Sequence, residues 1–381
     1  MTRGGAAAAD SVTDGATIER QRIRALDAFR GLSVAGMILV NHPGNPRHVW
    51  PPLAHAVWNG WTPADVVFPA FLFIVGVAIT LAHAPRRNDG ALVRRIVRRT
   101  VILFALGLML NAVPSFDLAH LRIPGVLQRI ALCYLIASLV FLTTEPGGQL
   151  ALLVGLLIAY WILMIWVPVP GIGPGVLEPD TNLGAWLDRR LLGGHLAHGS
   201  WDPEGLLSTI PAIATTLMGV LAGHWVRGAR STTAKSAGLI VAGIVCIAAG
   251  EWLGLWFPIN KSLWTTSFAV LMGGIAALLL GGCLWLVDVR GHRGLAAPFV
   301  VFGSNPIVLY VLATVAAKLL DVVTVTRRDG TATSLHALVY QRAFAGWTGP
   351  NMGSALFAVA LVAAWLAPMT YLYRRGLFVK V

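Results

Sequence analysis

A histidine and an aspartate stand ten residues apart in the stretch AHAVWNGWTPADVVFP, residues 54–69. A carboxylate that accepts a hydrogen bond from one imidazole nitrogen fixes the tautomer and leaves the other nitrogen as a base or nucleophile. Tryptophans and prolines surround His55, and such side chains exclude water and suit a membrane interface. The residue types therefore indicate proton transfer or covalent catalysis at His55, with Asp65 orienting the ring.

The segment WTPAD also has the pattern of a helix start. Thr62 fits the N-cap, Pro63 the first helical position and Asp65 the third, where a carboxylate can cap the free backbone amides. Asp65 is thus a partner of His55 or only a capping residue, and His55 alone fits an ordinary surface position. The spacing does not decide between these alternatives.

A second set of candidates lies within apolar segments, where charged groups usually face a cavity or a partner. Arg30 follows Asp27 by three residues, which fits either a local ion pair or contact with an anionic ligand. Gln128 and Arg129 occur together in the segment RIPGVLQRIALCY. Burying Arg129 costs at least about 2.5 kcal/mol, which favours a ligand or structural partner.

Two further segments place polar groups at helix interruptions. Asn305 precedes Pro306, and a proline frees a backbone carbonyl at a bend that an asparagine can line. Asn260 and Lys261 occupy a very short turn, where Lys261 also fits an interfacial anchor beside Trp264.

The segment HLAH, with His195 and His198, is followed by Asp202 and Glu204. This spacing is a weak metal signal, and we expect no metal. The sequence contains no GxxxxGK[ST], HExxH or GxSxG motif, so the common nucleotide-binding and hydrolase motifs are absent.

Composition defines the elements that must position these side chains. Of the 381 residues, 56% are hydrophobic and only 12% are charged, whereas soluble domains are about a quarter charged. Several apolar runs reach the roughly 20 residues that a membrane-spanning helix needs. We therefore predict an all-α polytopic membrane protein with about ten transmembrane helices, over residues 26–41, 64–83, 100–114, 124–143, 149–168, 205–226, 236–257, 263–287, 297–320 and 353–373.

The distribution of positive charge predicts the orientation. With the N-terminus inside, 18 of the 29 Lys and Arg residues lie in inner segments and 8 in outer segments. The positive-inside rule therefore predicts that both termini are cytoplasmic and that the His55 segment lies outside. The net charge of +12 is explained by these short basic loops, so we expect no nucleic-acid partner. Residues 1–23 are expected to form a disordered cytoplasmic tail and residues 24–381 one transmembrane domain.

Six segments together resemble one family, the heparan-α-glucosaminide N-acetyltransferases, in its compact bacterial form. The resemblance covers about residues 24–381, and the segments occur in the expected order: RALDAFRGLSVAGMILVNHPG, HAVWNGWTPADVVFPAFLFIVGVAI, RIPGVLQRIALCY, WDPEGLLSTIPAIATTLMGVLAG, INKSLWTTSFAVLMGG and VFGSNPIVLYV.

The resemblance implies transfer of an acetyl group from cytoplasmic acetyl-CoA to an amino sugar or glycan on the far side of the membrane. The family's essential histidine maps onto His55, its aspartate ten residues later onto Asp65, and its helix-ending asparagine onto Asn41. We expect a cavity for the co-substrate acetyl-CoA to be lined by polar residues, namely Arg30, Asn41, Gln128, Arg129, Asn260 and Asn305.

Several points stay open at this stage. The lysosomal members carry an additional domain before the first matched helix, so we expect a different acceptor here, such as a cell-envelope glycan. His55 could deprotonate the acceptor for direct attack or carry the acetyl group itself. A bacterial inner-membrane location, contact with membrane lipid and a homodimer are further expectations. The competing interpretation is a transporter or channel for an amino sugar or organic anion, for which Arg30, Arg129 and Lys318 would also serve.

Overall fold

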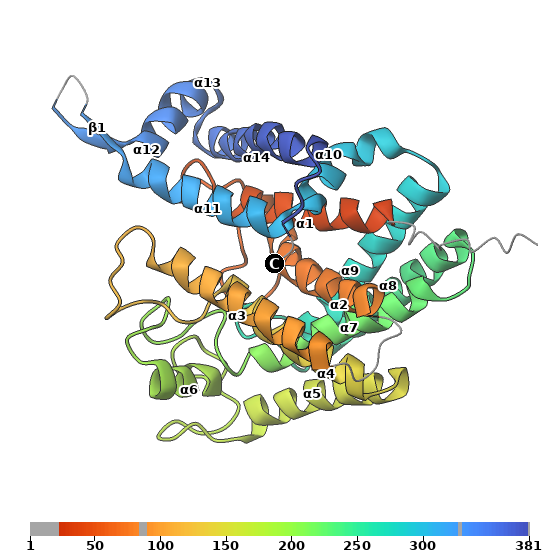
Figure 1. Cartoon of the computed structure of the whole chain (residues 1–381). Coiled ribbons are helices and arrows are strands. Elements are labelled where there is room, and N and C mark those ends of the chain that lie inside the picture. The colour runs from red at the N-terminus through yellow and green to blue at the C-terminus, as the bar shows by residue number, and fades with distance from the viewer. Residues whose placement is uncertain (1–22, 84–89, 327–329, 380–381) are drawn as a thin grey trace, which may run out of the picture.

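The computed structural model describes residues 23–83, 90–326 and 330–379. The tail predicted over residues 1–23 thus lies outside the described residues, except for Ile23. The described chain is mainly helical (Figure 1). The long helices are α1 (Arg24–Asn41), α2 (Val67–His83), α3 (Gly90–Ala112), α4 (Val126–Thr143), α5 (Pro146–Trp166), α7 (Thr209–Arg227), α8 (Thr232–Gly254), α9 (Thr266–Cys283), α10 (Arg293–Ser304), α11 (Pro306–Val322) and α14 (Pro350–Arg374).

Short elements complete the description of the chain. They are the 3₁₀ turns η1 (Pro51–Leu53) and η2 (Pro63–Val66), the helices α6 (Leu183–Leu192), α12 (Leu335–Tyr340) and α13 (Gly346–Thr348), the π-helical turns η3 (Leu284–Val289) and η4 (Gln341–Ala345), and the antiparallel strands β1 (Thr324–Thr326) and β2 (Ala332–Ser334). Thr324 pairs with Ser334 in this small hairpin.

The helices are those of a multi-pass membrane protein. Seven in the described part of the chain are long and apolar enough to cross a membrane, and the bent pair α10–α11 would be an eighth. Helices α1 and α3 also occupy predicted spans, but each carries several charged residues towards its N-terminus. The all-α polytopic architecture is therefore confirmed.

Helix α3 begins earlier than its sequence predicts. The span was expected from residue 100, because four arginines before it resembled a basic loop. The structure continues the helix back to Gly90, since Leu92, Ile96 and Thr100 recur every four residues and are all buried. The arginines therefore belong to the helix, and one of them, Arg99, reaches the protein interior.

The predicted span 297–320 is broken at Asn305. Helices α10 and α11 meet there at an angle of 78°. Pro306 begins α11, where its missing amide is tolerated. The bend was expected from the Asn-Pro pair, but an unbroken span was wrong. Close packing with α1 fixes α10, because a Cβ added at Gly303 would lie only 1.9 Å from the carbonyl oxygen of Asp27.

Helix α2 follows the His55 segment directly and is held tightly against α7. A Cβ added at Gly76 would lie 1.9 Å from the carbonyl oxygen of Thr216. One added at Gly219 would lie 1.9 Å from that of Phe73. Small residues allow such close helix approach in membranes. The backbone that carries Asp65 is therefore supported by a rigid helix pair.

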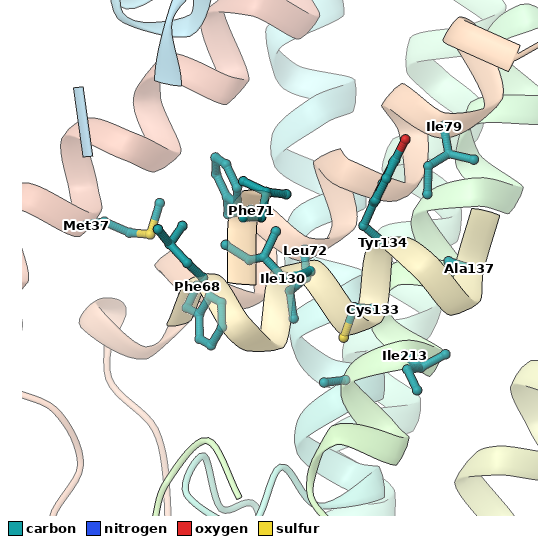
Figure 2. Packing of buried hydrophobic residues seen from close by; sticks show 14 of the residues in the cluster. Met37, Phe68, Phe71, Leu72, Ile79, Ile130, Cys133, Tyr134, Ala137 and Ile213 are labelled. Atoms are coloured by element: carbon teal, nitrogen blue, oxygen red, sulfur yellow. The ribbon is translucent and has the colours of Figure 1, made fainter. Parts of the chain in front are cut away.

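The core lies where α1, α2, α4 and α7 meet. Figure 2 shows Phe68, Phe71 and Leu72 of α2 beside Ile130 and other residues of α4, with Met37 of α1 at one side. Figure 1 shows α1 between α2 and the pair formed by α10 and α14. This packing leaves the connections at the N-terminal end of α2 free to form the site.

Candidate active site

His55 and Asp65 form a direct pair. Nδ1 of His55 lies 2.8 Å from Oδ1 of Asp65. The side chain of His55 is 39% exposed, whereas that of Asp65 is fully buried. When Nδ1 donates its proton to the carboxylate, Nε2 carries the free lone pair. The arrangement is a buried orienting carboxylate with an accessible imidazole.

The other oxygen of Asp65 caps the helix start. Oδ2 accepts hydrogen bonds from the backbone amide of Thr62 at 3.0 Å and from that of Ala56 at 3.1 Å. The hydroxyl of Thr62 binds the carbonyl oxygen of Ala54 at 2.7 Å. Asp65 is therefore both a partner of His55, through Oδ1, and a capping residue, through Oδ2. The expected helix start at Thr62 and Pro63 is confirmed.

Lys261 is a third member of the cluster, which we call the His55 cluster (His55, Asp65 and Lys261). Its Nζ lies 3.2 Å from Oδ1 of Asp65. The same atom lies 2.9 Å from Nδ1 and 3.4 Å from Nε2 of His55. Sequence analysis identified Lys261 only as an interfacial anchor. Its distance along the chain from His55, 206 residues, hid the contact.

A backbone clamp brings Lys261 to His55. The amide of Gly60 donates to the carbonyl oxygen of Ile259 at 2.7 Å. Asn59 and Asn260 form an isolated antiparallel bridge, and the Asn260 amide group donates to Oδ1 of Asn59 at 3.2 Å. Gly60 has a φ of +94°, a left-handed conformation that glycine adopts without strain. The clamp therefore fixes the two site segments to each other.

Asn260 was expected to contact acetyl-CoA, and the structure places it inside this clamp. It is fully buried, and its Oδ1 accepts from the amide of Leu263 at 2.9 Å. These bonds hold the turn that presents Lys261. A contact of this side chain with the co-substrate stays a prediction.

Two tryptophans of the His55 segment contact other parts of the chain. The indole nitrogen of Trp58 donates to the carbonyl oxygen of Leu177 at 3.1 Å, and its ring meets Trp201 edge-on at 5.3 Å. Trp61 donates to Glu251 at 3.2 Å. The long connection 167–208 thus packs against Trp58 of the His55 segment.

Arg129 is buried more deeply than the His55 cluster. It is 1% exposed, and its guanidinium stacks over the ring of Trp264 at 5.1 Å. Trp264 in turn meets Phe68, one turn beyond Asp65 in the chain. Nη2 of Arg129 binds Ser208 and the carbonyl oxygen of Gly205, but Nε and Nη1 have no hydrogen-bond partner. A buried guanidinium with two free donors suits a polar or anionic ligand.

Gln128 packs against helix α3 instead of against Trp264. It is buried between α3 and α4, where a Cβ added at Gly107 would lie 2.2 Å from its Oε1. Its Nε2 lacks a hydrogen-bond partner. Nothing in the described residues joins Gln128 to the His55 cluster.

A cavity of about 490 Å³ opens on the other side of the core, between the N-terminal half of α1 and α2, α3, α4 and α11. Its wall is mainly apolar and includes Phe71 and Ile130. Four polar residues, Arg30, Arg99, Tyr134 and Ser304, also line it. This volume and chemistry are typical of small-molecule sites.

The two arginines of this cavity are held differently. Arg30 pairs with Asp27 at 3.0 Å, so the predicted local ion pair is present and the residue also lines the cavity. The guanidinium of Arg99 lies over the ring of Tyr134 at 4.7 Å, and its Nε has no hydrogen-bond partner. Sequence analysis missed Arg99 because it was assigned to a basic loop.

Asn305 and Asn41 line neither the cavity nor the His55 cluster. Nδ2 of Asn305 donates to the carbonyl oxygen of Leu377 at 2.9 Å, and its Oδ1 accepts from the amide of Val379 at 2.8 Å. Asn305 therefore fastens the C-terminal segment beside the cavity that Val379 lines. Asn41 is exposed at the end of α1 and does not line the cavity.

The HLAH segment forms other contacts than a metal site. His195 lies 2.8 Å from the carbonyl oxygen of Leu121, while Arg122 binds both oxygens of Asp202 and also contacts Glu204. Over the described ranges, no group of three His, Cys, Asp or Glu side chains is placed to hold a metal ion.

Comparisons with known proteins show which family this chain resembles. The family model described as heparan-alpha-glucosaminide N-acetyltransferase, catalytic, matches residues 22–256. The human heparan-alpha-glucosaminide N-acetyltransferase is 31% identical over 352 residues, which cover 76% of this chain and 52% of the human protein. The mouse protein of the same name is 31% identical over 354 residues, which cover 76% of this chain and 53% of that protein. The chain therefore spans about half the length of these relatives. It belongs to the family of the heparan-α-glucosaminide N-acetyltransferase catalytic region.

Proposed function

We propose that the protein is a transmembrane acetyltransferase that moves acetyl from cytoplasmic acetyl-CoA to an amino sugar or glycan on the extracytoplasmic side. The observation that carries this proposal is the hydrogen bond between accessible His55 and fully buried Asp65. The family membership supports the reaction class, because the matched human and mouse proteins are named as N-acetyltransferases of a glucosaminide.

His55 has two routes to acyl transfer. In direct transfer, Nε2 removes the proton from the acceptor nitrogen while that nitrogen attacks the thioester carbonyl, and then returns the proton to the departing sulfur. In the covalent route, Nε2 attacks the carbonyl and the C–S bond breaks, releasing the CoA thiolate; the amine then attacks the acetyl-imidazolium, frees His55 and gives its proton to the thiolate. In both, the Asp65 carboxylate holds Nδ1–H and supports the positive ring.

The cavity beside α2 is our proposed site for acetyl-CoA. Arg30 and Arg99 would supply cationic partners for phosphate groups, and the apolar wall suits the pantetheine arm. Phe71, which lines the cavity, follows Asp65 by six residues, which corresponds to about 9 Å along a helix. An extended arm can cover this distance.

The acceptor is proposed to approach from the loops at the N-terminal end of α2. The long connection 167–208 contacts the His55 segment through Trp58. The Lys and Arg distribution supports placing this end outside the cytoplasm. A CoA nucleotide cannot cross hydrocarbon, so substrates entering from opposite faces would meet at His55.

The proposal is tested with purified protein in detergent, acetyl-CoA, and a panel of glucosamine, galactosamine and glucosaminyl disaccharides. Mass spectrometry is expected to show a gain of one acetyl group on the amine and equimolar free CoA. N-acetylglucosamine, which has no free amine, is the control acceptor. Unmodified sugars and intact acetyl-CoA, combined with sugar uptake into proteoliposomes, would instead establish the transporter interpretation.

A further inference from the structure

Lys261 lies beside the imidazole nitrogen at which acyl transfer would take place. We propose that its ammonium group is a catalytic electrophile that stabilises the negative charge on the acyl carbonyl oxygen during transfer. This inference rests on the proposed acetyltransferase function. It gives Lys261 a task that neither the pairing of His55 with Asp65 nor the acetyl-CoA cavity supplies.

The distances place the ammonium group within reach of the reacting oxygen. Nδ1 of His55 faces Asp65 at 2.8 Å, so Nε2 is the nitrogen available to the substrate. Nζ of Lys261 lies 3.4 Å from Nε2. Oxyanion donors act at about 2.7–3.1 Å from the oxygen. The oxygen of a carbonyl carbon attacked by Nε2, or by an amine hydrogen-bonded to Nε2, can therefore reach this range of Nζ.

The hydrogen-bond inventory leaves Lys261 a proton for this purpose. An ammonium group has three donors. One is directed to Oδ1 of Asp65 at 3.2 Å. When Nδ1 donates its own proton to Asp65, it cannot accept from Lys261, despite their 2.9 Å separation. Nε2, at 3.4 Å, can accept a second proton of the ammonium group, which leaves the third for the substrate. The side chain of Lys261 is only 21% exposed, so its charge is partly shielded from water.

The transfer step balances without a net change at Lys261. The amine lone pair forms the new C–N bond, and the π electrons of the carbonyl move onto oxygen, where Lys261 donates a hydrogen bond. Nε2 of His55 takes the amine proton. The oxygen electrons then reform the carbonyl, the C–S bond breaks, and the sulfur receives the proton from Nε2. The products are an acetamide and free CoA thiol.

The turn that carries Lys261 is rigid, as preorganised charge stabilisation requires. Trp264 donates its amide to the carbonyl oxygen of Lys261 at 3.0 Å and adopts a φ of +52°. Such a conformation is costly for a bulky residue and persists only when its surroundings fix it. Here the buried indole donates to Thr215 at 3.1 Å and lies beneath Arg129.

The test compares Lys261→Met and Lys261→Gln with the wild type, using acetyl-CoA and chloroacetyl-CoA as donors. Loss of an oxyanion donor typically lowers kcat by about 10²–10³. We expect this loss with acetyl-CoA and a loss at least about tenfold smaller with chloroacetyl-CoA, because chlorine itself stabilises the oxyanion. The affinity for free CoA should stay unchanged. Thermal unfolding confirms that each variant is folded.

Two results would overturn the inference. A kcat unaffected in both variants would remove Lys261 from the reaction. An equal loss with both donors would mean that Lys261 only positions Asp65. Absence of transfer by the wild type would instead overturn the proposed function, so the two failures are separable.

Discussion

Oδ1 of buried Asp65 lies 2.8 Å from Nδ1 of exposed His55. The same carboxylate holds the start of α2 through Oδ2, at 3.0 Å from the amide of Thr62. The position of the imidazole is thus coupled to a helix that packs tightly against α7. A ring fixed by such a carboxylate loses little entropy when it meets its substrate.

Replacing His55 by alanine is expected to lower kcat by about 10²–10⁴, since the variant loses its proton-transfer or nucleophilic group. Because the side chain is 39% exposed, unfolding temperature should change little. Product formation is measured by mass spectrometry after thermal unfolding has shown that the variant is folded. His48→Ala, at another exposed histidine of the same connection, is the matched control and should retain activity. Wild-type turnover by a folded His55→Ala protein would contradict the proposal.

Asp65 can be separated into its two roles by two substitutions. Asp65→Ser retains a capping hydroxyl and Asp65→Asn retains one capping oxygen, but both remove the charge that faces His55. If orientation of His55 is the main role, both variants should lose rate by about 10²–10⁴ with only a small change in unfolding temperature. Nearly full activity of the serine variant would leave capping as the only role.

The sequence was informative where the relevant neighbours are local. The helix start at Thr62 and the bend at Asn305 depend on a few adjacent residues, and both were predicted correctly. The pairing of His55 with Asp65 was one of two alternatives, and the contact is present. Its catalytic role stays a prediction, because a hydrogen bond does not show turnover.

Distant contacts escaped sequence analysis. Lys261 reaches His55 only because the bridge between Asn59 and Asn260 joins two turns about 200 residues apart. Arg99 enters the cavity because α3 continues back to Gly90, a boundary that the arginines obscured. A single sequence gives neither the register of such packing nor the direction of a side chain.

The orientation of the chain is tested by cysteine labelling in intact cells. Ala197→Cys and Thr233→Cys place thiols at exposed positions of opposite predicted sidedness. A membrane-impermeant maleimide should label the variant at 197 and leave that at 233 unlabelled until the cells are permeabilised. The native cysteines lie in helices, and Cys133 is buried, so the unsubstituted protein supplies the background. The reverse labelling pattern would place the His55 segment in the cytoplasm.

Asp188 lies in α6, outside the spanning helices, and we expect it to make the stability of the protein depend on pH. Burial raises the pKa of this carboxyl group to about 6, although it accepts from the amide of Leu206. The folded state therefore binds more protons than the unfolded state between about pH 4 and 6. This contribution to stability is full below about pH 4 and is lost as the pH rises through 6. Its size is roughly 3 kcal/mol at most, from about two pKa units.

Unfolding of the detergent-solubilised protein as a function of pH measures this effect. Asp188→Asn keeps an acceptor for the amide of Leu206 and removes the titration. The stability of the variant relative to the wild type should therefore increase from pH 4 to 7. Asp180→Asn, at another acid of the same connection, is the control. A difference that does not change with pH would contradict the raised pKa.

The cavity predicts that Arg30 and Arg99 bind the phosphate groups of CoA. Arg30→Gln, which can still donate to Asp27, and Arg99→Met should each weaken CoA binding by about 1.5–3 kcal/mol, the usual value of a hydrogen bond to a charged group. Binding of acetyl-pantetheine, which lacks the nucleotide, should barely change. Isothermal titration calorimetry measures both ligands without requiring turnover. Arg98→Met, at the exposed neighbouring arginine, controls for the general loss of positive charge and should leave both affinities unchanged. Equal weakening for CoA and acetyl-pantetheine would mean that these arginines shape the cavity, and the nucleotide would then have to bind at arginines outside it.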